Sequence, residues 1–262
     1  MRGVSNDSRS TRGETVGARH DPAASQEAPV AGHEAPAAGH EVLAVILQVR
    51  SGQLCVLLWR RAMAPYAQTW AVPGGALGPH EELGVSIRRQ LAQKVDVREL
   101  AHLEQLETRG APDRYPGRRV LATAYLGLVP SHLDPHVPAD TAWHPASDLP
   151  ETAFDHAELI ASGRRRLRAK LSYSNAGFAL APPTFTMSEL RTCYRAALGY
   201  DVSATNLQRI LLRRGQIEPT GQAAPSGRSG GRPPTVYRFR ERQLRITDEF
   251  AVLRPPHPYA TT

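Results

Sequence analysis

Lysine is nearly absent from this chain of 262 residues. Of its 32 lysine and arginine side chains, only Lys94 and Lys170 are lysines. Cysteine is equally scarce, with Cys55 in an expected strand and Cys193 in an expected helix. Two lone thiols so placed support neither a zinc site nor a disulfide framework. No apolar run is long enough to span a bilayer, and there is no lipidation motif or secretory signal. These absences favour a cytoplasmic protein without a membrane partner.

The first 39 residues have almost no large apolar side chains and are rich in Ala, Gly, Pro, His, Ser and Glu. Such a segment cannot bury enough surface to offset the entropy lost on ordering. Its histidines are scattered and form no ligand cluster. We therefore expect residues 1–39 to be a disordered leader without a metal site.

Charge divides the chain, leader included, into two parts. Residues 1–159 contain 15 Lys and Arg against 19 Asp and Glu, a net charge of −4. Residues 160–262 contain 17 against 6, a net charge of +11. The length allows two domains, and the basic one is expected to meet a polyanion. Nucleic acid is the leading candidate and an anionic membrane surface the alternative.

The acidic half shows strand and helix patterns. Two apolar runs, His40–Val49 and Gln53–Trp59, are joined at Ser51-Gly52 and predict a strand pair with a tight turn. Val120–Val129 predicts another buried strand. Between them, an apolar stripe with a spacing of four residues predicts an amphipathic helix, through Leu83, Ile87, Leu91 and Val95.

The Gly-rich turn before this helix completes a known pattern. The stretch from Gly75 to Val97 resembles the Nudix box, G-x5-E-x7-R-E-U-x-E-E-x-G-U, where U is a bulky aliphatic residue. Five positions agree with it: Gly75, Glu81, Arg89, Leu91 and Val97. Four depart from it, with Gln90, Gln93 and Lys94 in place of three acids and Asp96 in place of a glycine.

These replacements remove the metal ligands of the box. Phosphoanhydride hydrolysis needs divalent cations to neutralise the diphosphate and to activate water. Two amides and an ammonium cannot replace three carboxylates, since lysine has no acceptor. Lys94 instead puts a positive charge close to the expected cation position. We predict a domain that is not an enzyme, requires no metal or cofactor, and binds a nucleotide without cleaving it.

The candidate ligand residues lie before this box and within it. A guanidinium matches phosphate oxygens bidentately, an indole can stack on adenine, and paired glycines allow close backbone approach. Two structural alternatives stay open, since Arg89 can organise the helix and Trp70 can belong to the core. The candidates are Arg60, Arg61, Trp70, Gly74, Gly75, Glu81 and Arg89.

The basic half predicts a helix-turn-helix. A helix is expected from after Asp155 to about Tyr173, with Gly163 as a weak point. Thr186 and Glu189 form a capping box for a second helix that stops near Gly199. A third helix starts at Ser203 and ends at Gly215, with Leu207, Ile210 and Leu211 on its buried face.

The segment behind the helix pair predicts a wing. Gln216–Thr220 and Thr235–Phe239 are expected strands, and Gly221–Pro234 between them is a loop rich in Gly and Arg. Strand, basic loop and strand after a helix-turn-helix is the order of a winged helix. A solvated linker is the alternative for the loop.

The helix from 203 to 215 is the expected recognition helix. Asn and Gln can bind adenine bidentately, and Arg can bind guanine. The candidates for base contacts are Thr205, Asn206, Gln208, Arg209 and Arg213, and those for phosphate contacts are Arg214, Arg228 and Arg232. The alternative for each residue is an ordinary charged helix face.

From about His40 to Phe239 the chain resembles the NrtR family of Nudix-related regulators. The resemblance rests on Leu58–Arg61, Trp70–Gly75, the altered box, Ala153–Ala157, Lys170–Ser174 and Gly230–Pro233. It implies a Nudix-type α/β/α sandwich with a mixed sheet, within the α/β (α+β) class, followed by a winged helix-turn-helix. It also implies an ADP-ribose sensor and a homodimeric repressor of NAD synthesis or salvage genes. The DNA partner would be a double-stranded pseudo-palindromic operator.

The expected divisions of the chain are a leader at 1–39, the Nudix-like sensor at 40–160, a linker helix and connection at 161–182, the winged helix at 183–245 and a tail at 246–262. Two other functions stay open. One is an active ADP-ribose or nucleotide-sugar pyrophosphatase with a basic accessory domain. The other is a DNA-binding protein in which the Nudix fold is only a dimerisation scaffold.

Overall fold

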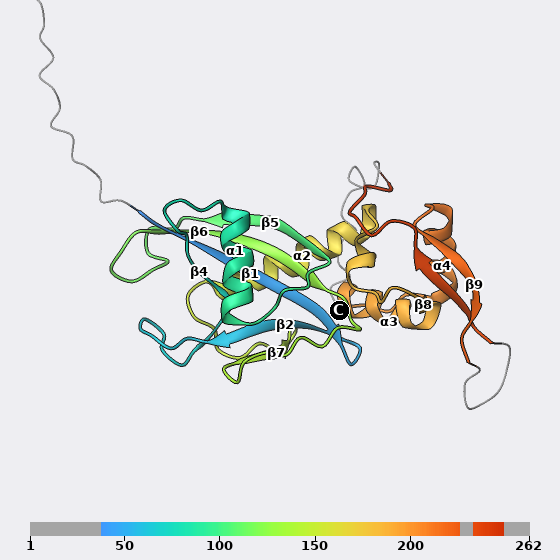
Figure 1. The fold of residues 1–262 in the computed structure, drawn as a ribbon, viewed down its shortest axis with the longest axis horizontal. Helices are drawn as coiled ribbons and strands as arrows, with labels where there is room; N and C mark the ends of the chain where they lie inside the picture. The colour runs from blue at the N-terminus through green and yellow to red at the C-terminus, as the bar shows by residue number, and fades with distance from the viewer. Residues whose placement is uncertain (1–37, 226–232, 249–262) are drawn as a thin grey trace, which may run out of the picture. The chain divides into compact units, whose positions relative to one another are not determined.

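A computed structural model describes residues 38–225 and 233–248 of the chain. Its larger sheet has seven strands in the order β3-β2-β1-β6-β5, with β4 paired to β1 and β7 to β2 (Figure 1). The pairing of β1 with β6 is parallel and the others are antiparallel, so the sheet is mixed as expected. The strands are β1 Gly39–Arg50, β2 Gln53–Arg60, β3 Trp70–Ala71, β4 Gly74–Ala76, β5 His102–Arg109, β6 Val120–Val129 and β7 Thr141–Pro145.

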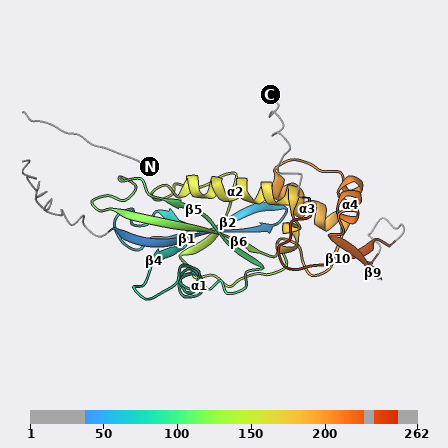
Figure 2. The ribbon, with the colours of Figure 1, turned by 90° about the horizontal axis from the view of Figure 1, so that it is seen from above.

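Two helices cover the two faces of this sheet, α1 (Leu83–Lys94) on one and α2 (His156–Tyr173) on the other (Figure 2). Strand β1 is buried on both faces, and its side chains alternate between them. Val42, Ala44 and Ile46 pack with the apolar stripe of α1. Leu43, Val45 and Leu47 belong to the core that contains Leu159 and Ile160 of α2.

The strand pair, the buried strand at Val120–Val129 and the helices at Leu83 and after Asp155 are confirmed. Gly163, the expected weak point, lies inside α2, which continues through it to Tyr173. A Cβ atom there would lie 2.8 Å from Cγ1 of Val45, so the glycine allows α2 to cross β1 closely. Asp96 replaces a glycine of the box and has a φ of 51°. An Asp tolerates this left-handed conformation better than most residues.

The basic half forms a winged helix, as predicted. A three-stranded sheet in the order β8-β10-β9 packs with two helices. Thr186 and Glu189 form the capping box, Gly199 ends the first helix with a φ of 79°, and Ser203 caps the second. Strand β9 runs to Ala223, past the predicted start of the loop. The elements are β8 Phe185–Thr186, α3 Met187–Leu198, α4 Ala204–Arg213, β9 Ile217–Ala223 and β10 Thr235–Phe239.

One apolar core joins the sandwich to the winged helix. A short 3-10 helix, η1 (Ala176–Ala179), follows α2, and Phe178 in it is buried together with Leu190 of α3. The amide of Ser131, just after β6, donates to the carbonyl of Leu180 at 2.9 Å. Within the described part of the chain, no helix has both the length and the apolar composition that a membrane crossing requires.

Candidate functional site

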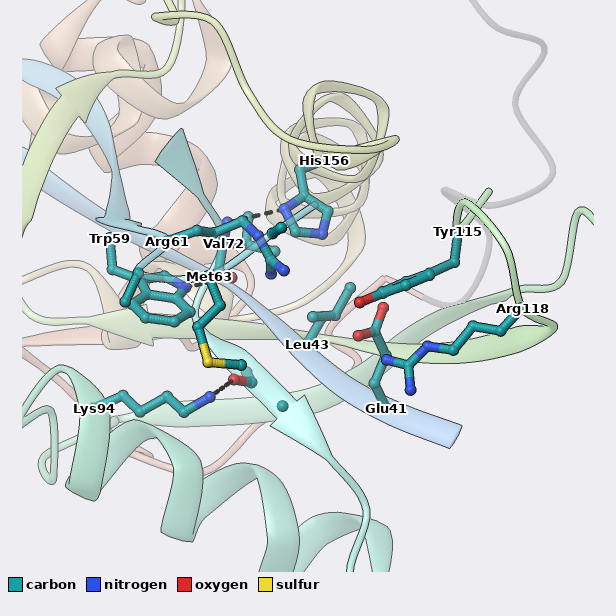
Figure 3. A pocket seen from close by; sticks show the side chains of 14 residues that line it. Glu41, Leu43, Trp59, Arg61, Met63, Val72, Lys94, Tyr115, Arg118 and His156 are labelled. Carbon is teal, nitrogen blue, oxygen red and sulfur yellow. Dashed lines mark hydrogen bonds between the residues drawn. The ribbon is translucent and has the colours of Figure 1, made fainter. Parts of the chain in front are cut away.

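A cavity of about 330 Å³ opens beside β1 and β4 (Figure 3). Its floor comes from these strands, and one side comes from the C-terminal end of α1. The segment after β2 and the loop before β6 form other walls, and the first residue of α2 completes it. The lining residues are Glu41, Leu43, Trp59, Arg61, Ala62, Met63, Ala64, Val72, Gly74, Gly75, Lys94, Tyr115, Arg118 and His156.

Lys94 brings a positive charge into this cavity. Its Nζ donates to the carbonyl oxygen of Gly74 at 2.6 Å and lies 4.9 Å from the ring centroid of Trp59. Burial lowers the pKa of Lys94, and the positive charges of Arg61 and Arg89 lower it further. A Cβ atom at Gly74 would lie 2.1 Å from the carbonyl oxygen of Val42. Glycine is therefore required where β4 presents its carbonyl to the ammonium.

The two glutamines of the altered box bind protein groups. Gln90 is buried and donates to the carbonyl oxygen of Ala76 at 3.2 Å. Gln93 accepts from Arg89 at 3.1 Å. The described residues contain no group of three His, Cys, Asp or Glu side chains placed to hold a metal ion. Because the helix presents amides and an ammonium here, this face does not fit Mg²⁺, which needs oxygen ligands and prefers carboxylates.

His156 contributes a buried polar atom to the same cavity. Its Nδ1 accepts from the backbone amide of Val72 at 3.2 Å, so the neutral ring carries its hydrogen on Nε2. That Nε2 is buried and has no hydrogen-bond partner among the described residues. Burial lowers the pKa of His156 to about 3, although the charge of Asp155 opposes the shift. The wall of the cavity therefore holds an unpaired hydrogen-bond donor on His156, which Figure 3 shows.

A buried arginine holds the walls of the cavity together. Arg114 binds Glu41 of β1 at 2.7 Å and Asp155 at 2.8 Å. Burial alone would lower its pKa, but the bonds to both carboxylates raise it. The adjacent Tyr115 has the guanidinium of Arg118 4.2 Å from its ring centroid. Glu41 is thus neutralised within the wall, and the cavity keeps a positive balance.

The structure places the predicted ligand residues in two groups. Arg61, Gly74 and Gly75 line the cavity. Arg60 and Trp70 do not line it. The guanidinium of Arg60 lies over the indole ring of Trp70, 4.8 Å from its centroid, and Trp70 packs against the core.

Glu81 and Arg89 also lie outside this lining. They form an ion pair at 2.6 Å. The hydrogen bonds from Arg89 hold the pKa of Glu81 at about 2. The structural alternative for Arg89 thus agrees with its contacts, while a ligand role for any of these residues stays a prediction.

Sequence reasoning missed several lining residues. They are Trp59, Met63, Tyr115, Arg118 and His156, from a strand end, two loops and a helix start, and the two loops belong to no motif. Only the tertiary fold brings these segments together. The signals that were available are Leu58–Arg61, which contains Trp59, and Ala153–Ala157, which contains His156; both marked the family resemblance.

On the candidate recognition helix α4, four predicted side chains are exposed: Thr205, Asn206, Arg209 and Arg213. Gln208 instead donates to the hydroxyl of Tyr237 at 2.8 Å. Arg214 binds Asp248 and donates to the carbonyl of Ser172 at 2.7 Å. These two side chains therefore have partners within the protein. Arg228 and Arg232 lie outside the described residues.

Comparison with protein families gives two matches along the chain. Residues 39–163 match the NUDIX domain, and residues 177–239 match the NrtR DNA-binding winged helix domain. The structure of a MutT/nudix family protein from Enterococcus faecalis superposes with a TM-score of 0.65. That match covers 78% of this chain and 89% of the other at 23% identity, so it bears on the fold alone.

Two relatives are similar to about three quarters of the chain. The ADPR responsive transcriptional repressor NtrR of Acinetobacter baylyi is 28% identical over 201 residues, covering 74% of this chain and 79% of the relative. The crystal structure of Shewanella oneidensis NrtR complexed with a 27mer DNA is 31% identical, with a TM-score of 0.67. It is matched over 76% of this chain and 93% of its own length. The chain therefore belongs to the NrtR family.

Proposed function

We propose that this protein is a transcriptional repressor whose NUDIX domain binds ADP-ribose without cleaving it. The observation that carries the proposal is the position of Lys94. Its ammonium contacts the Gly74 carbonyl at the cavity floor, on the helix where a Nudix box presents carboxylates. The relative from Acinetobacter baylyi, an ADPR responsive repressor by name, supports the choice of ligand.

The cavity suits a diphosphate ester with an apolar end. Lys94, Arg61 and Arg118 supply positive charge for the diphosphate oxygens. The free Nε2–H of His156 supplies a directional donor to a phosphate or a ribose hydroxyl. The apolar side chains of the lining, Leu43, Met63 and Val72, would cover the adenosine end. Because Lys94 provides the charge that a cation supplies elsewhere, binding needs no divalent metal.

The winged helix would act on DNA. We expect a dimer to place two copies of α4 in successive major grooves of a pseudo-palindromic operator, near genes of NAD synthesis or salvage. Arg209 and Arg213 are exposed on that helix. If ADP-ribose binds more tightly to a dimer arrangement in which the two winged helices cannot hold both half-sites, it shifts the dimers to that arrangement and off the operator. Repression would then fall as ADP-ribose rises.

Calorimetric titration with ADP-ribose, in EDTA and again in Mg²⁺, tests the site. We expect equal affinity in both buffers and no AMP release on chromatography. Lys94→Met should weaken binding by about tenfold or more, since a hydrogen bond to a charged group contributes roughly 1.5–3 kcal/mol. Arg88→Met is the matched control, because Arg88 is exposed on the same helix and does not line the cavity.

Three results would contradict the proposal in different ways. AMP release with Mg²⁺ would make the protein a pyrophosphatase. Binding that requires Mg²⁺ would reject the role of Lys94. Absence of binding in both buffers would leave the NUDIX domain as a scaffold for dimers.

A further inference from the structure

A second cavity, of about 440 Å³, lies between α2, the end of α3 and the edge of the larger sheet. It shares no lining residue with the cavity beside β4. Three arginines reach it, Arg164 and Arg168 from α2 and Arg195 from α3. The rest of its lining is Gly52, Gln53, Leu54, Ala146, Ser147, Ala196, Gly199, Tyr200 and Asp201.

These three guanidiniums have no carboxylate partner among the residues that the structure describes. Asp201 is the one acid in the lining, and both of its oxygens accept from Arg191 at 2.8 Å. Arg164 donates from Nη1 to the carbonyl of Ala146 at 2.8 Å. The Nε atoms of Arg164 and Arg168 are buried, and neither has a hydrogen-bond partner in the described ranges.

Such a cluster is unfavourable without an anion. Burial lowers the pKa of Arg164, and the charge of Arg168 lowers it further. Arg164 and Arg168 are half-buried and Arg195 is exposed, so the part that has lost water is the two Nε–H groups. Buried donors without partners destabilise a fold. In the described part of the chain, Arg165 and Arg166 of the same helix have no buried Nε without a partner, and Arg165 donates to Ser162 and Arg166 to the carbonyl of Leu106. The deficit is therefore local to this cavity.

We propose that this cavity binds a small molecule through its phosphate groups. Guanidinium forks match phosphate oxygens bidentately, and donors from two helices can surround one diphosphate. Tyr200 is 62% exposed at the rim and offers an aromatic surface to the rest of the ligand. A ligand here contacts the β1–β2 turn, α2 and α3 together. It thus connects the NUDIX sheet to the first helix of the helix-turn-helix.

Pyrophosphate is the probe, and its binding is measured by calorimetry. Every sample is the full chain carrying Lys94→Met, so that binding in the first cavity is weakened throughout. We expect pyrophosphate to bind this protein and to raise its thermal midpoint. Adding Arg168→Gln or Arg195→Gln should weaken binding by about tenfold or more each. Arg165→Gln is the control, since Arg165 lies on α2 outside this lining, and it should leave binding unchanged.

The ligand-free protein provides a second readout. Arg168→Gln should raise its thermal midpoint, because the variant removes a charge beside Arg164. This result also shows that the variant folds. The proposal is overturned if the Lys94→Met protein does not bind pyrophosphate, or if adding Arg168→Gln leaves that binding intact. It is also overturned if Arg168→Gln weakens only DNA binding and reduces its salt dependence, which would identify a DNA phosphate contact.

Discussion

Single residues of the first cavity have charge states that the fold determines. Lys94 has a lowered pKa because its side chain is half-buried, and His156 is a neutral imidazole with one unpaired N–H. The sequence placed Lys94 correctly at an altered position of the box, because the spacing of the motif identified it. It offered no rule for His156, whose role depends on the amide of Val72, 84 positions away.

His156 makes stability depend on pH. Its folded pKa, about 3, is below the ordinary value of 6.5, so its stabilisation is complete above pH 6.5. It is lost as the pH falls towards 3, by about 1.4 kcal/mol per unit. The free energy of unfolding, measured in urea, should fall between pH 7.5 and pH 5.5 by roughly 1.4 kcal/mol more in the wild type than in His156→Asn.

The carboxylates with lowered pKa values do not titrate in the pH range used for His156. Burial would raise the pKa of Glu104, but bonds from His102 and Lys170 lower it to about 2, and that of Glu81 is also about 2. Their stabilisation is lost only as the pH falls below about 4.5 towards 2. An equal loss of stability in the wild type and His156→Asn would show that this histidine is not the titrating group.

Individual elements were predictable where the sequence carries a period or a cap. The apolar stripe of α1, the capping box of α3 and the glycine after it are local signals, and both helices formed as expected. Strand β5 is half polar and lies at the sheet edge, so alternation did not reveal it. The two-residue strands β3 and β8 exist only through pairing with distant strands. Tertiary contacts decide such elements.

At α2, helix propensity and packing oppose each other. Ala favours a helix interior over Gly by about 1 kcal/mol. A Cβ atom at position 163 would meet Val45 at 2.8 Å, and overpacking typically costs about 1–3 kcal/mol. We expect Gly163→Ala to lower the free energy of unfolding. Val45→Ala in the same protein should recover part of the loss, and a double-mutant cycle in urea measures the coupling. Additive effects would contradict the contact.

At α4, two neighbouring side chains should behave differently. Arg209→Ala removes an exposed guanidinium, so we expect operator affinity to fall by about 1–3 kcal/mol with stability unchanged. Gln208→Ala removes the bond to Tyr237, so stability should fall. Operator titration and thermal unfolding of both variants separate the two effects. If Arg209→Ala binds the operator normally, the exposed face of α4 does not read bases.

At the scale of the whole molecule, composition and motif order were sufficient to predict two domains and their kinds. The acidic front corresponds to the NUDIX match at 39–163 and the basic back to the winged helix match at 177–239. The cavities were not predictable, since each collects residues from loops and helix ends that are far apart in sequence. A continuous apolar core through Leu167, Phe178 and Leu190 joins the domains. Packed side chains therefore connect the NUDIX domain to α3.

The most direct test of the account is release of DNA by ADP-ribose. The operator is first selected from fragmented genomic DNA on the purified protein, and its binding is then followed by fluorescence anisotropy in EDTA. We predict an inverted repeat near genes of NAD synthesis or salvage, and loss of the complex as ADP-ribose is added, with the nucleotide recovered intact. Lys94→Met should need about tenfold or more ADP-ribose for the same release. A complex that persists at saturating ADP-ribose, or that dissociates only as AMP accumulates, would contradict the account.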